Sequence, residues 1–295
     1  MKIKNTKSTK AFNVLGFIYI TFIALFCLIP FIIVISGSFT SEEYIVKHGY
    51  SLLPQDFSVE SYKAIFMFPK QIINAYGVTI FVTITGTIIG LTLISMGGYV
   101  LQRKDFKYRN AVSFYIYFTT LFGGGLIPWY ILMTKYLGLK DTYRVLIIPG
   151  LMSPFLIILM KNFMKSIPEE IVESAKVDGA GDFKIYASLV MPLAKPALAT
   201  IGLFLALAYW NDWFTSSIFI TSAKKFSLQY VLYQILQTSE FFRSGASANV
   251  DTNYNIPTES LKLATAVIAT GPVILFYPFV QKYFVQGLTV GAVKG

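Results

Sequence analysis

The sequence contains few charged residues, one cysteine and one histidine. Charged residues make up 14% of the 295 residues, against about 25% in an average soluble domain. Cys27 has no second cysteine to pair with, which excludes a disulfide within the chain. With His48 as the only histidine, the chain also lacks the cluster of ligands that a metal site needs.

The chain also lacks the glycine loop, followed by Lys and Ser or Thr, that holds nucleotide phosphates. Its nearest approach is Gly179-Ala180-Gly181, which is followed by Asp182 and does not match that pattern. We therefore expect no cofactor in this chain, and in particular no ATP.

Apolar residues are abundant instead, at 55% of the chain, and aromatic residues make up 16%. A helix needs about 20 apolar residues to cross a membrane. The first apolar run is longer than the roughly 7–15 residues of a signal peptide core, so we expect it to be retained. We predict an all-α polytopic membrane protein with six transmembrane helices, at Val14–Ile35, Ala75–Leu101, Ala111–Met133, Val145–Met160, Ala197–Thr221 and Leu263–Tyr283.

The basic residues predict the orientation of these spans, because cytoplasmic loops are rich in Lys and Arg. Placing the N-terminus in the cytoplasm puts 15 of the 25 basic residues inside: four in the tail 1–13, four in Gln102–Asn110, five in Lys161–Lys195, and Lys282 and Lys294. Six spans return the C-terminus to the cytoplasm. The net charge of +10 is then mostly a topology signal, and we expect no nucleic-acid partner.

Two predicted outer segments are long, Gly37–Asn74 and Lys224–Ser260, and the second includes a predicted short helix near Leu228–Leu236. Long loops are often functional. Receiving an external partner and packing over the bundle both remain open.

The polar segment Ser166–Pro196 interrupts the apolar pattern. Ser166 and Glu169 fit a capping box, and the helix that follows is predicted to run to Asp178. Gly179 is suited to the left-handed conformation that ends a helix, and Asp182 is a plausible cap for a second helix.

That second helix has an apolar stripe of Phe183, Tyr186, Ala187 and Val190. Three interpretations compete for the two helices. A DNA-binding helix–turn–helix is disfavoured, because residues 161–195 carry five acids against five lysines. The other two are packing on the chain's own bundle and docking to a partner, for which the Glu173 carboxylate beside small side chains could accept an arginine.

The spacing in this segment resembles the "EAA" loop of ABC importer permeases. That pattern is Glu-Ala-Ala, three residues, Gly, nine residues, then Ile-x-Leu-Pro, and the chain follows it from Glu173 through Gly179 to Pro192. The departures are mild: Ser174, Leu189 and Met191. The form Asp178-Gly179-Ala180 is similar to that of the carbohydrate-uptake branch.

Other stretches resemble the smaller permease of oligosaccharide importers, closest to lipoprotein-linked, pectin- or alginate-fragment transporters. They are Phe122–Pro128, Leu137–Thr142, Gln281–Gly287 and Gly291–Gly295. The resemblance implies a type I ABC importer permease fold in the bacterial cell membrane, with a single permease domain at 14–295 and a cytoplasmic coupling loop at 166–196.

The resemblance also implies partners and residue roles. The partners are a homologous second permease, two ATPase subunits that bind ATP and Mg²⁺, an external solute-binding protein, an oligosaccharide substrate and membrane lipid. Glu173 would pair with an arginine of the ATPase, Ala175 would pack in its cleft and Gly179 would make the bend. The whole coupling set is Glu173, Ser174, Ala175, Asp178, Gly179, Ala180 and Pro192.

A sugar site needs aromatic faces and a few polar groups. The fifth span offers five candidates in a row, Tyr209, Trp210, Asn211, Asp212 and Trp213. Asp212 is either a functional intramembrane acid or a structural one, and both interpretations stay open. Trp129 and Tyr130 are weaker candidates, for which interfacial anchoring is favoured.

Glycines in two spans point to local features. Gly86 and Gly90 allow close contact with another helix, in this subunit or in the partner permease, and Gly123–Gly125 allow the third span to unwind.

Two other functions are weighed against an oligosaccharide permease. A membrane-embedded enzyme would need a set of reactive groups, yet His48, Cys27 and Asp212 each stand alone in the sequence. A permease of the amino-acid or peptide branch is the second alternative.

Overall fold

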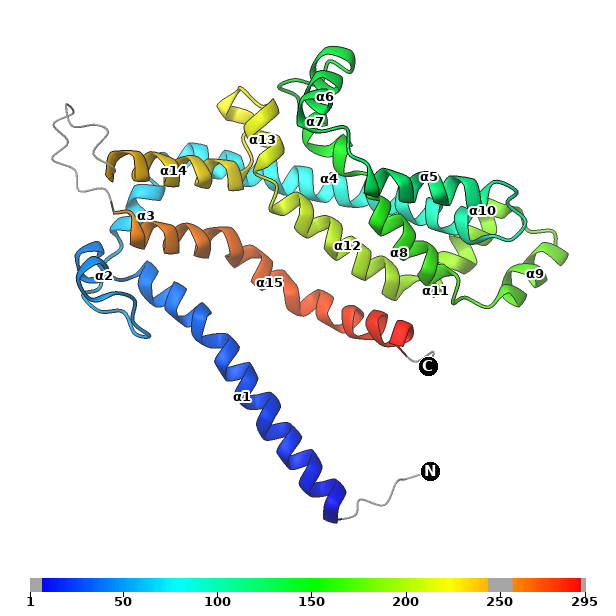
Figure 1. Ribbon diagram of the computed structural model, residues 1–295, viewed down its shortest axis with the longest axis horizontal. Helices are drawn as coiled ribbons and strands as arrows, with labels where there is room; N and C mark the ends of the chain where they lie inside the picture. Colours follow the sequence, from blue (N-terminus) through cyan, green and yellow to red (C-terminus); the bar gives the residue numbers. More distant parts are fainter. Residues whose placement is uncertain (1–6, 244–256, 293–295) are drawn as a thin grey trace. The chain divides into compact units, whose positions relative to one another are not determined.

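The structure is a computed structural model that describes residues 7–243 and 257–292, and its regular elements there are helices (Figure 1). This confirms the predicted all-α class. Parts of the predicted basic tail, the second outer segment and the C-terminal motif lie outside the described residues.

The helices are α1 (Lys7–Ser38), α2 (Glu42–His48), α3 (Glu60–Ile65), α4 (Pro69–Gln102), α5 (Arg109–Leu121), α6 (Leu126–Ile131), α7 (Tyr143–Ile147), α8 (Pro154–Met164), α9 (Glu169–Val177), α10 (Asp182–Ile185), α11 (Met191–Leu193), α12 (Lys195–Trp210), α13 (Phe214–Phe219), α14 (Leu228–Arg243) and α15 (Glu259–Ala292).

The chain divides into two compact units. The first unit consists of residues 1–69 with 234–271, and the second of residues 70–233 with 272–295. The loop at 166–196 and the aromatic candidates for a sugar site all lie in the second unit.

Two of the described helices, α1 and α4, are individually long and apolar enough to cross a membrane. Three pairs of helices are each bent at a short break, and they raise that number to at most five if each pair is one span. The pairs are residues 109–121 with 126–136, bent by 114°, residues 143–150 with 154–164, bent by 47°, and residues 182–193 with 195–210, bent by 84°. The largest of these bends lies at Gly123–Gly125, where the third predicted span unwinds. The sixth predicted run lies within α15.

The fifth predicted span is not one continuous helix. It is expected at 197–221, but α12 ends at Trp210 and a turn separates it from α13. Asn211, Asp212 and Trp213 form that turn, so the polar groups of the predicted span lie between two helices.

In the first unit, Glu42 of α2 caps the start of α15. Its carboxylate accepts hydrogen bonds from the backbone N–H groups of Glu259 and Ser260, at 2.9 Å each, and from the Ser260 hydroxyl at 2.8 Å. Burial raises the pKa of Glu42, but these hydrogen bonds outweigh it and the net pKa is lowered. Glu42 thereby joins the first predicted outer segment to the start of α15 by accepting backbone N–H groups that have no acceptor within the helix.

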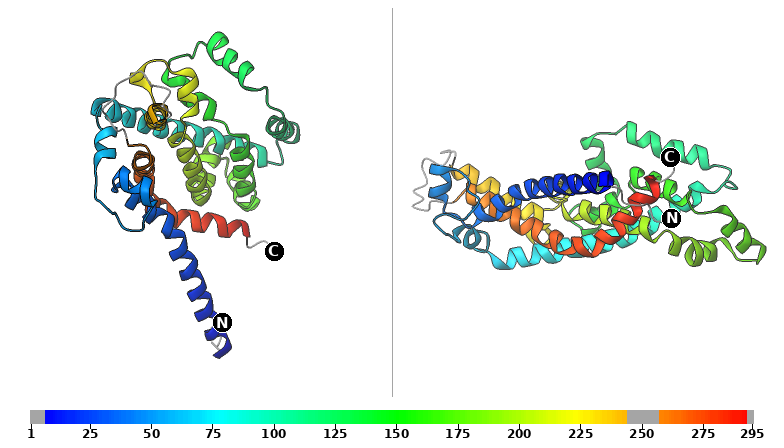
Figure 2. Two further views of the ribbon diagram at one scale, coloured as in Figure 1. Left: turned by 60° about the vertical axis from the view of Figure 1, so that its left-hand side comes forward. Right: turned by 90° about the horizontal axis from the view of Figure 1, so that it is seen from below.

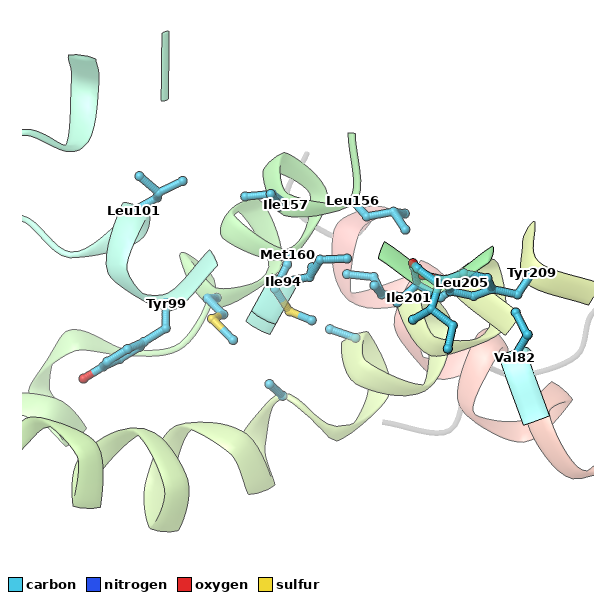
Figure 3. Close-up of a cluster of buried hydrophobic side chains, with 14 of the residues drawn as sticks. Val82, Ile94, Tyr99, Leu101, Leu156, Ile157, Met160, Ile201, Leu205 and Tyr209 are labelled. Atoms are coloured by element: carbon cyan, nitrogen blue, oxygen red, sulfur yellow. The ribbon is translucent and has the colours of Figure 1, made fainter. Parts of the chain in front are cut away.

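The core of the second unit lies among α4, α8 and α12, which run side by side (Figure 1 and Figure 2). Figure 3 shows the side chains that these helices contribute. Ile94 of α4, Met160 of α8 and Ile201 of α12 are all fully buried. Since such side chains carry no polar atoms in need of a partner, they hold the helices by close packing alone.

Tyr209 of α12 packs closely against two glycines of this core. A Cβ added at Gly86 would lie 2.5 Å from the Tyr209 ring, and one added at Gly150 would lie 2.8 Å from the Tyr209 hydroxyl. That hydroxyl donates to the carbonyl of Ile147 at 2.8 Å. Gly86 therefore serves close packing within this subunit, one of the two interpretations of the Gly86–Gly90 pair.

Asp141 joins two loops of the second unit. Its carboxylate accepts the backbone N–H groups of Thr221 and Ser222, at 3.1 and 3.0 Å, and pairs with Lys225 at 3.0 Å. The hydrogen bond from Ser222 and the pairing with Lys225 lower the pKa of Asp141 to about 2. Its φ of 53° is left-handed, a conformation that Asp and Asn tolerate better than most residues.

We predict that Gly86→Ala destabilises the second unit by about 1–3 kcal/mol, since overpacking forces a buried ring out of place. The measurement is thermal unfolding in detergent. The control is Gly77→Ala on the same helix, where an added Cβ meets no atom within 4 Å. Equal stability of the two variants would contradict the packing of Tyr209 on Gly86.

We predict that Asp141→Asn lowers the unfolding temperature at neutral pH. The folded pKa of Asp141 is below the usual aspartate value of 3.8. The carboxylate therefore stabilises the fold above that pH and loses this effect as pH falls through about 2. The difference between wild type and variant should therefore shrink between pH 4 and pH 2.

The control for this prediction is Asp56→Asn. Asp56 is also left-handed, with a φ of 48°, and is exposed. A difference that stays constant down to pH 2, or one as large for Asp56, would contradict the role of the Asp141 carboxylate.

Candidate functional site

The loop at 166–196 contains two helices joined at a glycine bend, as predicted. The first helix, α9, ends at Val177 with Asp178 as its cap residue. Gly179 has a φ of +75°, and the N–H of Ala180 donates to the carbonyl of Ala175 at 2.9 Å. The left-handed glycine satisfies the last carbonyls of α9 while turning the chain into α10.

The outer surface of this bend combines charge with apolar side chains. Glu173, Ser174, Asp178 and Gly179 are exposed, as is Pro192 in α11. Val177 is 87% exposed and Phe183 71%. Exposed apolar side chains rimmed by polar groups are typical of interaction sites.

Two members of the coupling set face inward instead. Ala175 is 9% exposed and belongs to the core of the second unit, and Ala180 is half-buried against that core. Ala175 therefore anchors α9 to its own unit, which leaves little of its side chain for a partner cleft.

The predicted caps of both helices are wrong. The Ser166 hydroxyl donates to the carbonyl of Phe163 at 2.6 Å, and Pro168 precedes α9 without a side-chain cap. Gly181 precedes α10, and Asp182 pairs with Arg103. Both acids that the caps would have used, Glu169 and Asp182, form ion pairs with residues distant in sequence.

The predicted apolar stripe of α10 is partly wrong. Tyr186 and Val190 are buried, but Phe183 and Ala187 are exposed, and Ile185 is fully buried in their place. Residues 186–190 form a π-helical turn. Because its hydrogen bonds join residues five apart, this turn shifts the positions that face inward from the α-helical spacing.

The inward face of this turn contacts α4. The Tyr186 hydroxyl is hydrogen-bonded to the Ser95 hydroxyl at 2.7 Å, and its ring lies 5.4 Å from that of Tyr99. The loop is thus packed on α4 behind the surface that it exposes.

Three consecutive residues just beyond α4 form ion pairs with the loop. Arg103 pairs with Asp182 at 2.6 Å, Lys104 pairs with Glu169, and Asp105 pairs with Lys176 at 2.8 Å. Sequence reasoning used Arg103 and Lys104 only as topology signals and missed these contacts. Their one sign in the sequence is the run of three charged residues at positions 103–105, two basic and one acidic.

Within residues 209–213, the first two side chains are buried. Tyr209 is 6% exposed and bonded to a backbone carbonyl, and Trp210 is 8% exposed with its ring 6.4 Å from that of Tyr76. Tyr209 therefore has a packing role within the second unit, and its contact with substrate stays a prediction.

Asp212 is a local cap. Its carboxylate accepts the N–H of Thr215 at the start of α13, at 3.0 Å, and its carbonyl accepts the Ser227 hydroxyl at 3.1 Å. This geometry supports the interpretation of Asp212 as a structural acid.

Asn211 and Trp213 are exposed, and each contacts a residue of α14. Gln229 donates to the Asn211 side-chain oxygen at 3.3 Å, and the Tyr233 ring stacks on Trp213 with centroids 4.5 Å apart. Trp213 is 39% exposed and Tyr233 38%. Gln229 and Tyr233, one turn apart on α14, were missed because nothing in the sequence links them to residues 211–213.

Trp129 and Tyr130 pack on one ring. Their centroids lie 4.8 and 5.6 Å from that of Phe219, which is fully buried. Both side chains are half-buried, and their contacts join α6 to α13 within the second unit.

No group of three or more His, Cys, Asp or Glu side chains that could hold a metal ion occurs among the described residues. The second unit exposes a helical loop at 166–196 and a surface of aromatic and amide side chains formed by Asn211, Trp213, Gln229 and Tyr233.

Comparison with known proteins places the chain in a family. Residues 90–290 match the family described as binding-protein-dependent transport system inner membrane component. The chain is 39% identical over 286 residues to the polygalacturonan/rhamnogalacturonan transport system permease protein YtcP of Bacillus subtilis, covering 97% of this chain and 99% of that protein. It is 37% identical over 293 residues to protein LplC of the same organism, covering 99% and 97%.

A solved structure is similar throughout. It is that of a bacterial ABC transporter involved in the import of the acidic polysaccharide alginate, with a TM-score of 0.76 and 32% identity over 95% of this chain and 98% of that chain. These matches confirm the resemblance drawn from the loop spacing. The chain belongs to the family of inner-membrane permease components of binding-protein-dependent ABC transport systems.

Proposed function

We propose that the chain is one permease subunit of an ATP-driven importer that takes an oligosaccharide from an external solute-binding protein. A homologous second permease completes the path, and two separate ATPase subunits bind ATP and Mg²⁺. The observation that carries the proposal is the bent loop at 166–196, which exposes Glu173 on a short helix fixed to the bundle behind it.

The proposed orientation has six spans and both termini in the cytoplasm. Two contacts support it. The segment 103–105 and the loop at 166–196, both predicted to be cytoplasmic, are joined by ion pairs. Asp141 and Lys225, both predicted to be outside, are paired as well.

Glu173 is the proposed contact to the ATPase. Its exposed carboxylate can accept a bidentate arginine, with Ser174 beside it and Val177 offering an apolar surface one turn further on. ATP-driven closure of the two ATPases then moves two such loops, and the attached spans rock between inward- and outward-facing states.

An acidic oligosaccharide from plant or algal material is the proposed substrate. One similar protein is described as a permease of a polygalacturonan/rhamnogalacturonan transport system, and another as part of a transporter involved in the import of alginate. The proposed contact surface is formed by Asn211 and Trp213 with Gln229 and Tyr233, because aromatic rings can lie against sugar rings while amides bond to hydroxyls.

We predict that Glu173→Arg abolishes uptake while the chain remains inserted in the membrane. Replacing an acceptor by a cation removes a charge-assisted hydrogen bond worth about 1.5–3 kcal/mol and adds repulsion from the partner arginine. The measurement is substrate uptake per ATP hydrolysed by the complete transporter in proteoliposomes.

The matched control is Glu170→Arg, a second exposed acid of α9. Unchanged coupling in Glu173→Arg, or equal losses in both variants, would contradict the assignment of Glu173.

We predict that the complete transporter takes up uronate-containing oligosaccharides and that Trp213→Ala raises the apparent KM by about 2- to 10-fold, since an aromatic contact is worth about 0.5–1.5 kcal/mol. Uptake kinetics with a panel of oligosaccharides, amino acids and peptides provide the measurement. Tyr136→Ala, at an aromatic side chain that is 74% exposed, is the control. Selective uptake of an amino acid or peptide would contradict the sugar assignment.

A further inference from the structure

We propose that Arg103, Lys104 and Asp105 form a clamp that stiffens the Gly179 bend and fixes the loop at 166–196 to the end of α4. Movement of the loop would then pass into α4 as well as into α8 and α12, the helices that it joins in sequence. The inference rests on the proposed function, because it concerns how the same loop transmits movement from the ATPases.

The clamp contacts the loop on both sides of its bend. Asp105 pairs with Lys176, which precedes Gly179 by three residues, and Arg103 pairs with Asp182, which follows it by three. Arg103 also donates to Asp105 from Nε at 2.8 Å and from a second guanidinium nitrogen. The chain of contacts Lys176–Asp105–Arg103–Asp182 therefore closes a ring across the glycine.

A bend of this kind needs such a ring in order to transmit force. Gly179 has a positive φ, and an added Cβ there would meet no atom within 4 Å, so side-chain packing at the glycine itself does not hold the bend. Ala175 is the buried side chain of α9. Without the ring, α9 could pivot at Gly179 when a partner pushes on Glu173, and the push would be lost as local bending.

The clamp is connected to α4 by its own position and packing. Arg103 directly follows Gln102, the last residue of α4, and its side chain is only 16% exposed. The guanidinium lies 5.7 Å from the centre of the Tyr99 ring, which in turn contacts Tyr186 of the loop. Lys104 adds a third contact at Glu169, at the start of α9.

The pKa values agree with this geometry. The hydrogen bonds from Arg103 and Lys176 hold the pKa of Asp105 far below its usual range. Asp105 is therefore charged at any physiological pH, and we class it and Arg103 as positioning residues that act through the loop.

The test uses the complete transporter in proteoliposomes with Asp105→Asn, which keeps the size of the side chain and removes the charge that both cations share. We expect transport per ATP hydrolysed to fall about five-fold, because the variant opens the ring at Asp105. The loss is limited because the Arg103–Asp182 and Lys104–Glu169 pairs remain, and partly exposed ion pairs are each worth little. ATP hydrolysis and co-purification of the ATPase subunits should persist. Lys184→Gln, at an exposed lysine of the same loop, should leave transport per ATP hydrolysed, ATP hydrolysis and co-purification of the ATPase subunits unchanged.

A chemical tether separates transmission of movement from general stability. Cysteines at positions 104 and 169, introduced with Cys27→Ser because Cys27 is the only native cysteine, are joined by a short thiol-reactive linker. In the Asp105→Asn background, the tether should restore most of the lost coupling. A tether that leaves coupling low would overturn the clamp.

A second variant guards against misfolding of the first. Asp182→Asn removes one partner of Arg103 and leaves the Asp105 contacts in place, and a smaller loss of coupling is expected. If Asp105→Asn and Asp182→Asn both keep full coupling while Glu173→Arg abolishes it, the clamp is wrong and the docking loop stands. If Glu173→Arg also keeps full coupling, the proposed function itself fails.

Discussion

The bend at Gly179 sets the requirement that the surrounding contacts meet. A left-handed glycine turns the chain sharply and satisfies the end of α9, but it offers no side chain to resist bending. The stiffness of the bend must therefore come from other residues, and two sets of contacts supply it. Ala175, Ile185 and Tyr186 pack into the core, and ion pairs from the turn after α4 join the two arms of the bend on the outside.

The same division between apolar and polar contacts is found through the second unit. The middle of α4, α8 and α12 is held by dense packing, in which the Tyr209 ring lies against Gly86 and Gly150. Charged contacts are found at the ends, around Asp105 and around Asp141. This is the arrangement expected where hydrocarbon surrounds the middle of a bundle, because unpaired polar groups are costly there while helix ends meet water.

Local sequence patterns predicted the features that depend on local physics. The conformational freedom of glycine predicted the end of α9, the left-handed Gly179 and the break at Gly123–Gly125. Apolar periodicity predicted the helical class. The resemblance to the family came from the spacing of Glu173, Gly179 and Pro192 in the loop at 166–196.

The misses share a physical cause, which is competition from groups distant in sequence. Glu169 and Asp182 satisfy the local rules for caps, but the cations at 103 and 104 bind them instead. A π-helical turn at residues 186–190 changed which side chains after α10 are buried, and no pattern in residues 182–190 predicts such a turn. The packing of the Tyr209 ring on Gly86 and Gly150 was also missed, because these glycines lie far away in the sequence.

The central claim is that the loop at 166–196 moves as one body with the end of α4 when ATP binds to the partner subunits. Spin labels at the exposed positions 107 and 170 of the complete transporter, in a Cys27→Ser background, give the distance within that body. Labels at position 170 and on the second permease's loop give the distance between bodies. The account predicts that ATP changes the second distance and leaves the first unchanged. A change in the first distance as large as that in the second would contradict it.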